Sequence, residues 1–278
     1  MDFKTKIGLG TVQFGTNYGI SNFNGQTSDV EVGDILDSAY RLGLKVIDTA
    51  AAYGEAENVI GHFDMARFKV VSKFMPPNES ANINSLLQKS LDKLQTDRLY
   101  GFLAHRPMQL LSNPEQWEEL LKLKNENKIK KIGFSLNAPE EIDLLLSKGF
   151  MPDLIQVPYN YFDNRFENSM IALKESGCEI HTRSTFLQGL FFLNPDHLNP
   201  FFKEVKPLIK SLQENNEYLA SSLLVYSLKK EFIDKVIIGV ETNNQLIQNL
   251  NTIEKAKSLP KLNSIIEEKI LNPSLWEK

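Results

Sequence analysis

Eight short runs rich in β-branched and aromatic residues recur along the chain, and segments with helical periodicity separate them. The runs cover residues 6–12, 45–50, 68–74, 99–106, 130–135, 154–160, 179–185 and 235–240. Many of them are apolar on both faces, as strands buried in a parallel sheet must be. This regular alternation of strand and helix predicts βαβ units and a parallel sheet.

The segments between these runs carry helix signals of their own. Residues 28–43 begin with Ser28 and Glu31 at the spacing of a capping box and end at Gly43. Helical periodicity also predicts helices at 82–95, 117–128, 139–149, 165–177 and 243–256, a short helix near 57–63, and one more inside the long connection 186–232. Residues 261–278 are expected to form a packed helix and a short extension.

Eight strand–helix units in about 250 residues predict an α/β fold of the (β/α)8 barrel type, a TIM barrel. The main alternative is a doubly wound sheet, which usually carries a GxGxxG turn after its first strand. This chain has GLGTVQFG at residues 8–15 instead. Since no linker or low-complexity tract interrupts the sequence, we expect one barrel domain over residues 1–278 with a C-terminal helical extension.

Composition narrows the classes of function. The formal net charge is −4, which gives no electrostatic reason to bind nucleic acid or an anionic membrane. Cys178 is the only cysteine, so an intramolecular disulfide and a cysteine-rich metal site are excluded. The N-terminus lacks the apolar core of a signal peptide, and no stretch has the ~20 apolar residues of a membrane span. We therefore expect a cytoplasmic protein with a small-molecule partner; the oligomeric state is open.

Polar side chains stand at the ends of three consecutive predicted strands. Asp48 ends the second run, and Tyr53 lies in the loop that follows it. Lys73 ends the third run and His105 the fourth. Because active sites of such barrels form at the C-terminal ends of the strands, these four side chains are expected to converge on one mouth.

Together the four residues favour chemistry on a carbonyl group. A buried Lys73 needs a counter-ion, which Asp48 can supply. A cation beside a phenol favours the phenolate and so eases proton transfer by the phenol. His105 can donate a hydrogen bond to a carbonyl oxygen. Each residue alone has a commoner structural explanation, such as a helix cap for Asp48. The set is suited to protonating an alkoxide as it forms, which is what happens when hydride adds to a carbonyl.

The other histidines do not share this placement. His62 follows a short helix, His197 lies in a Pro-containing loop, and His181 falls inside the seventh run, where packing is the expected role. No two histidines stand at metal-ligand spacing with a nearby acid, so we predict no metal site.

With these residues in view, the chain resembles the aldo-keto reductase family over nearly its whole length. The motif VIDTAAAYGEAE (46–57), followed by strand-end Lys73 and His105, is the most specific part, and GLGTVQFG (8–15), FLAHR (102–106), TRSTFLQGL (182–190) and VIIGVETNNQLIQN (236–249) support it. The similarity is to uncharacterised bacterial oxidoreductases of that family. It implies a barrel enzyme that transfers hydride from NADPH or NADH to an aldehyde or ketone. Tyr53 would be the general acid, tuned by Lys73 and Asp48, with His105 orienting the carbonyl.

The resemblance also implies a cofactor site. Ser135 and Gln156 would hold the nicotinamide carboxamide, and Asn249 the adenine. The helix that begins near Thr242 would offer free backbone N–H groups to a phosphate. The full implied set is Thr11, Asp48, Ser135, Gln156, Arg183, Ser184, Gly239, Thr242, Gln245 and Asn249.

Two departures from the family pattern concern the nicotinamide. Many members have Ser-Asn after the fifth strand, whereas here Ser135 is followed by Leu136 and then Asn137. Many members stack a Tyr on the nicotinamide from the seventh strand, and Arg183 holds that position here. A guanidinium plane can stack on an aromatic ring, but the contact differs. The N-terminus is short, so the hairpin that often closes the barrel bottom is expected to be small or missing.

A further departure concerns the 2′-phosphate of NADP. The family's Lys-Ser pair and Arg for this phosphate fall on Gly239, Val240 and Gln245, and Glu241 adds a negative charge. The resemblance favours NADP(H), but NAD(H) is possible because the Arg position is Gln245.

The substrate is less constrained. The loop 13–27 is rich in Asn, Gly and aromatic residues, and seven aromatic side chains are candidates for the pocket wall or for loop packing: Phe14, Tyr18, Phe23, Phe162, Phe186, Phe191 and Phe192. A mixed aromatic and amide wall suits a polar carbonyl compound such as a sugar or sugar-nucleotide. Two other functions stay open: a cofactor-sensing barrel that regulates a partner without turnover, and a Schiff-base aldolase with Lys73 as nucleophile.

Overall fold

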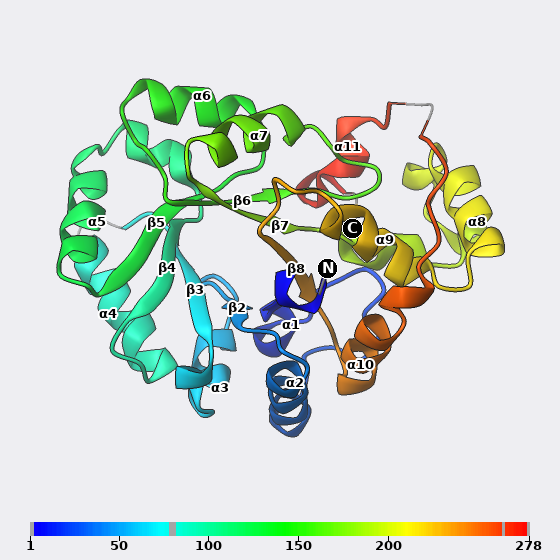
Figure 1. Ribbon diagram of the computed structural model, residues 1–278, viewed down its shortest axis with the longest axis horizontal. Coiled ribbons are helices and arrows are strands. Elements are labelled where there is room, and N and C mark those ends of the chain that lie inside the picture. The colour runs from blue at the N-terminus through cyan, green and yellow to red at the C-terminus, as the bar shows by residue number, and fades with distance from the viewer. Residues whose placement is uncertain (1–2, 78–81, 263–264, 277–278) are drawn as a thin grey trace.

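The computed structural model describes residues 3–77, 82–262 and 265–276 and contains a closed barrel of eight parallel strands. Each strand neighbours the strands before and after it in sequence, and β1 closes the barrel against β8 (Figure 1). The strands are β1 Ile7–Gly10, β2 Val46–Asp48, β3 Lys69–Phe74, β4 Leu99–Ala104, β5 Ile129–Ser135, β6 Leu154–Pro158, β7 Glu179–Arg183 and β8 Lys235–Gly239. The predicted (β/α)8 fold is confirmed. The extent of the domain, residues 1–278, stays a prediction.

Helices surround the barrel and cover the outer face of the strands (Figure 1). The helices of the described residues, not all of which contact the strands, are α1 Val12–Gly15, α2 Asp29–Arg41, α3 Ala56–Gly61, α4 Ile83–Leu94, α5 Glu115–Asn125, α6 Glu140–Ser147, α7 Glu167–Glu175, α8 Lys206–Asn215, α9 Leu219–Leu228, α10 Asn243–Asn251 and α11 Glu268–Leu271. In α2 the predicted cap forms, since Ser28 Oγ accepts a hydrogen bond from the Glu31 N–H. The apolar face of α2, for example Val32 and Leu36, is buried against the strands.

The connections between these elements contain short 3-10 segments. They are η1 Phe3–Lys6, η2 Met65–Arg67, η3 Pro107–Leu111, η4 Leu187–Phe192, η5 Pro195–His197, η6 Pro200–Phe202, η7 Ile253–Lys255 and η8 Pro273–Leu275. Segment η1 leads directly into β1, and the described residues before β1 contain no strand. Among the described residues, no helix has both the length and the apolarity that crossing a membrane requires.

The barrel interior is small and separate from the main core. Its apolar part consists of Val46, Val71, Leu103, Leu154 and Ile237, one from each of five strands, with Tyr100 packed beside them. The larger apolar core lies between the strands and the helices. Because side chains alternate along a strand, one set of positions lines the interior and leads to the polar residues at the C-terminal ends.

Several predicted elements are longer than the observed ones. The first strand ends at Gly10 because residues 12–15 form a helical turn, and α10 ends at Asn251 instead of 256. The C-terminal extension contains one turn of α-helix, α11, and then η8. Pro273 has no N–H to continue α11, and Asn272 instead accepts a hydrogen bond from the Ser274 N–H.

Candidate active site

The four strand-end residues Asp48, Tyr53, Lys73 and His105 meet at the C-terminal mouth of the barrel. Asp48 is the last residue of β2, Lys73 lies one residue before the end of β3, and His105 directly follows β4. Asp48 is 3% exposed and Lys73 is fully buried. The predicted convergence is therefore present in the structure.

Lys73 makes the central contacts of this cluster. Its Nζ donates to Asp48 Oδ2 at 2.7 Å and to the Thr49 carbonyl oxygen at 2.8 Å, and it lies 3.4 Å from Tyr53 Oη. Burial alone would lower the pKa of Lys73, but Asp48 and then Tyr53 outweigh burial, so the pKa is raised above its usual value. Lys73 is an ammonium ion throughout the neutral range.

Backbone hydrogen bonds bring Tyr53 back over the barrel. The Thr49 and Ala51 N–H groups bond to carbonyl oxygens of β3, so pairing with β3 continues beyond the end of β2. The Tyr53 N–H then bonds to the Ala50 carbonyl oxygen at 3.0 Å, which closes a turn. Gly15 of α1 packs directly on this turn, where an added Cβ would collide with the Tyr53 carbonyl oxygen. The small residues of this segment thus allow Tyr53 to stand above Lys73.

His105 lies beside Tyr53 with its ring nearly perpendicular. The ring centroids are 5.8 Å apart at an interplanar angle of 83°. Burial, together with the positive charges of Lys73, Arg183 and Arg106, lowers the pKa of His105 to about 3. The imidazole is therefore neutral near pH 7, with one N–H donor and one bare acceptor nitrogen.

Gln156 supports Asp48 from the opposite side of the barrel. Its Nε2 donates to Asp48 Oδ1 at 2.6 Å, so Gln156 and Lys73 each bind one oxygen of the carboxylate. Gln156 is fully buried, and Ser135, which pairs with it in the β5–β6 register, is 2% exposed. Sequence reasoning placed Gln156 against a cofactor and did not foresee its bond to Asp48.

Arg183 lies in the wall of the mouth and is held by backbone and side-chain oxygens. Its Nη2 donates to the Leu136 carbonyl oxygen at 3.0 Å and to Asn137 Oδ1 at 2.8 Å, and its Nη1 lies 3.3 Å from Ser184 Oγ. Ser184 adopts a left-handed backbone conformation with φ of 65°. These contacts fix the guanidinium plane, and they explain how Asn137 takes part although it stands one residue later than in the family pattern.

A cavity of about 1100 Å³ opens above this cluster. Nine of the predicted site residues line it: Thr11, Asp48, Tyr53, His105, Arg183, Ser184, Gly239, Gln245 and Asn249. Four do not line it, because Lys73, Ser135 and Gln156 lie buried beneath the mouth and Thr242 caps α10. The predicted residues therefore divide into nine that line the cavity and four that lie behind its wall.

The seven aromatic candidates also divide into residues that line the cavity and residues that are buried in the packing. Tyr18, Phe23, Phe186 and Phe192 line the cavity. Phe14, Phe162 and Phe191 are buried packing residues. The wall also includes Phe202 and Trp276, which lie far along the chain from any strand end and gave no sequence signal.

Two backbone N–H groups in the first turn of α10 already have protein partners. Thr242 Oγ1 accepts from the Gln245 N–H at 3.2 Å, and Gln245 Oε1 accepts from the Glu241 N–H at 2.8 Å. The Asn243 N–H donates to Glu31 Oε1 of α2 at 2.5 Å. The expectation that these groups are free for a phosphate is therefore wrong for Asn243 and Gln245. No local pattern around residue 243 could have revealed the carboxylate of Glu31.

The chemistry of the cavity fits a nicotinamide dinucleotide. Gln13 lines the wall, yet its Oε1 is buried and has no hydrogen-bond partner among the described residues. The side chain of Gln13 fills the space beside Gly239, where an added Cβ would come within 2.6 Å of Gln13 Nε2. The unpaired Gln13 Oε1 can accept a hydrogen bond from a hydroxyl or a carboxamide N–H of a ligand. A nicotinamide dinucleotide carries both groups.

Comparison with known proteins gives a consistent picture. Residues 6–269 match the model of the Aldo/keto reductase family. The chain is 25% identical over 277 residues to the uncharacterised oxidoreductase YqkF of Bacillus subtilis, covering 88% of this chain and 86% of that protein. It is 23% identical over 283 residues to L-galactose dehydrogenase of Arabidopsis thaliana, covering 92% and 88%. An aldo-keto reductase from Klebsiella pneumoniae, solved with NADPH, has a TM-score of 0.66 at 23% identity, covering 91% and 87%.

The low pKa of His105 predicts an acid-dependent loss of stability. An unfolded histidine titrates near pH 6.5, so the folded protein binds this proton more weakly and loses stability as the pH falls from about 6.5 towards 3. His105→Gln keeps a neutral polar group and removes this loss. The difference in unfolding free energy between pH 7 and pH 4, measured by chemical denaturation, should shrink by an amount on the order of 3 kcal/mol. The same substitution at the exposed His62 is the control, and an equal change there would contradict the prediction.

Proposed function

This chain belongs to the aldo/keto reductase family, and on that premise we propose that it reduces an aldehyde or ketone to an alcohol with a nicotinamide dinucleotide, Tyr53 acting as the general acid. One observation carries the proposal. A fully buried Lys73 ammonium, paired with Asp48, lies 3.4 Å from the Tyr53 hydroxyl at the wall of a large cavity.

The proton step follows from these contacts. The bound dinucleotide supplies the hydride, and negative charge then develops on the carbonyl oxygen of the substrate. Tyr53 Oη gives that oxygen its proton, and the Lys73 ammonium stabilises the phenolate that remains. Because Asp48 holds Lys73 by an ion pair of 2.7 Å, the charge is already in place before the reaction begins.

His105 serves as a neutral hydrogen-bond donor to the same oxygen. An imidazolium here would add a second positive charge next to Lys73, and the pKa of about 3 excludes it near pH 7. A neutral imidazole can orient the carbonyl through one N–H without competing with Tyr53 as the acid. Arg183 ends β7, and its guanidinium donates to the Leu136 carbonyl oxygen and to Asn137 Oδ1. It supplies a flat cationic surface in the cavity wall.

The geometry disfavours the aldolase alternative. A Schiff base needs a neutral lysine amine that reaches the substrate. The pKa of Lys73 is shifted upward by Asp48 and Tyr53 against the effect of burial, and the side chain does not line the cavity. The alternative of a cofactor-sensing protein without turnover is tested by the assay described below.

Removing the hydroxyl of Tyr53 tests the proposal. Tyr53→Phe should lower kcat by about 10²–10⁴-fold, since general acid catalysis contributes this much. Tyr40→Phe, on the outer surface of α2, is the matched control and should keep wild-type rates. Turnover is followed as oxidation of the reduced dinucleotide. Wild-type rates in Tyr53→Phe would contradict the assignment, and tight cofactor binding by a wild-type protein with no turnover on any carbonyl would favour the sensing function.

We propose further that the protein discriminates weakly between NADPH and NADH. Family membership favours NADP(H). Yet among the described residues that line the cavity, Arg183 is the one basic side chain, and it stands at the mouth of the barrel, while Glu241 lies near α10. Glu31 also directs its carboxylate to the first turn of α10. Two carboxylates, with no Lys or Arg beside this helix among the described residues that line the cavity, would oppose a 2′-phosphate, whereas ribose hydroxyls can donate to carboxylates.

Fluorescence titration with each reduced dinucleotide tests this preference. The two dissociation constants should agree within about tenfold, or 1.4 kcal/mol. Gln245→Arg should strengthen NADPH binding by about tenfold and leave NADH binding unchanged, because only NADPH carries a phosphate for the guanidinium. Gln248→Arg adds the same charge on an exposed face of α10 outside the cavity and is the control. A wild-type preference for NADPH of a hundredfold or more would contradict the proposal.

The cavity wall suggests the substrate class. Aromatic side chains such as Tyr18, Phe192 and Trp276 alternate with amides such as Asn17 and Gln188. Aromatic faces pack on the apolar faces of a sugar ring, and amides can both donate and accept hydrogen bonds to its hydroxyls. We therefore propose a sugar or sugar-nucleotide carbonyl. The Arabidopsis relative, L-galactose dehydrogenase, is also named after a sugar.

A substrate panel tests this class. Sugar-nucleotide ketones and free aldoses should give a higher kcat/KM than simple aldehydes. Phe192→Ala should lower kcat/KM for the sugar substrates by about 2- to 10-fold, since Phe192 is 43% exposed and forms part of the wall, and should change simple aldehydes little. Turnover restricted to simple aldehydes would contradict the sugar proposal and leave the carbonyl reduction intact.

A further inference from the structure

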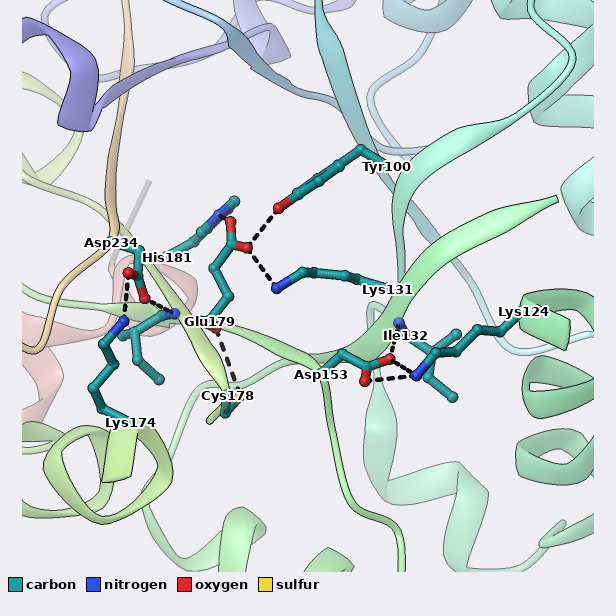
Figure 2. Close-up of polar contacts among 11 residues, drawn as sticks. Tyr100, Lys124, Lys131, Ile132, Asp153, Lys174, Cys178, Glu179, His181 and Asp234 are labelled. Atoms are coloured by element: carbon teal, nitrogen blue, oxygen red, sulfur yellow. Dashed lines mark hydrogen bonds and ion pairs between the residues drawn. The ribbon is translucent and has the colours of Figure 1, made fainter. Parts of the chain in front are cut away.

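A second, partly buried polar cluster lies in the barrel, towards the N-terminal ends of the strands, and the proposed reaction does not use it. At its centre is Glu179, the first residue of β7 (Figure 2). One carboxylate oxygen, Oε1, lies 2.7 Å from His181 Nε2. The other, Oε2, accepts from Tyr100 Oη at 2.6 Å and from Lys131 Nζ at 2.7 Å.

These contacts determine which nitrogen of His181 carries a proton. Burial would raise the pKa of Glu179, but the hydrogen bonds from His181, Lys131 and Tyr100 outweigh burial and hold this pKa well below its usual range. Glu179 is therefore a carboxylate, which only accepts hydrogen bonds. His181 Nε2 must then be the donor, and Nδ1 faces away from Glu179.

Two buried polar atoms lack partners between this cluster and the active site. His181 is fully buried, and its Nδ1 has no hydrogen-bond partner among the described residues. Gln156 is also fully buried, and its Oε1 likewise has none. Leaving such buried atoms unpaired is unfavourable, so a contact that satisfies both is favoured.

Strand register places these two residues side by side. Gln156 of β6 and His181 of β7 are paired positions, and paired side chains in a parallel sheet point to the same face. That face is the barrel interior, since Gln156 reaches Asp48 of β2 across the barrel. Glu179 lies two residues before His181 in β7, so the two side chains point to the same face. On that face Glu179 contacts Tyr100 of β4.

We propose that His181 is a positioning residue for the active site and that it acts through Gln156. One water that donates to both Nδ1 and Oε1 would link His181 to the Gln156 carbonyl oxygen. The Gln156 amide is then fixed with its NH2 group towards Asp48. A continuous polar chain results along the barrel interior: Glu179, His181, Gln156, Asp48, Lys73 and Tyr53.

The inference rests on the proposed function, because the end of this chain is the proton donor Tyr53. If the amide of Gln156 rotates, its oxygen faces the Asp48 carboxylate and the two repel. Asp48 would then shift and carry Lys73 with it. A displacement of about 1 Å at a catalytic group can cost up to 10²-fold in rate. Substrate binding in the cavity would be little affected, because neither His181 nor Gln156 lines it.

Two substitutions at residue 181 separate the two nitrogens of the ring. Asn places its polar group near the position of Nδ1, whereas Gln places its polar group near the position of Nε2. His181→Gln should therefore keep the contact with Glu179 and lose the contact with Gln156, lowering kcat by about 10- to 100-fold with KM for the carbonyl unchanged. His181→Asn should retain kcat within about threefold of the wild type. Equal rates in the two variants, or the reverse order, would overturn the proposal.

A measurement without cofactor or turnover supports the same test. In protein labelled with ¹⁵N-histidine, the His181 signals are assigned by their loss in His181→Asn. Gln156→Leu should move the Nδ1 resonance of His181 and leave His62 unchanged. A wild-type Nδ1 resonance typical of an unbonded ring nitrogen would overturn the proposal even if His181→Gln fails to fold.

The two proposals fail in distinguishable ways. A wild-type protein that reduces no carbonyl disproves the proposed function. A wild-type protein that turns over, together with a His181→Gln variant of equal kcat, disproves the role of His181 alone.

Discussion

The buried ion pair between Lys73 and Asp48 is the interaction on which the rest of the mouth depends. Moving two charges out of water costs several kcal/mol for each ion, and their attraction offsets this only when the geometry is good and the remaining hydrogen-bonding positions are filled. Here Lys73 has three partners at the strand ends, and Asp48 has one partner on each carboxylate oxygen. Only a closed barrel can bring Gln156 of β6 opposite β2 to complete this arrangement.

The single positive charge of Lys73 acts on both of its aromatic neighbours. It lies 3.4 Å from the hydroxyl of Tyr53, where it favours the deprotonated product of a proton transfer. It also contributes, after burial, to the low pKa of His105. The same charge thus prepares one residue to give up a proton and keeps the other neutral, so the two side chains have separate tasks although their rings are in contact.

The end of the cavity beside α10 is built from different contacts than the catalytic end. There the first turn of α10 is closed by Thr242, Gln245 and Glu31, and no cation takes part among the described residues that line the cavity near it. The catalytic end is held by buried contacts, whereas this end is defined by exposed and half-buried polar groups. Cofactor preference can therefore be altered by surface substitutions that leave the catalytic end unchanged.

The sequence by itself determined the eight strands, the barrel and the four catalytic candidates, because strand periodicity is local and the topology of a barrel sends every strand end to one mouth. It could not tell which candidates reach the cavity. Ser135 ends its strand as Asp48 does, and Gln156 lies two residues before the end of β6, yet only the closed packing shows that both lie beneath the cavity. Contacts between distant segments also escaped prediction: Glu31 is 212 residues from Asn243, and Gln156 is 108 residues from Asp48. Such pairs have no periodic signal along the chain, since only the tertiary structure brings their side chains within bonding distance.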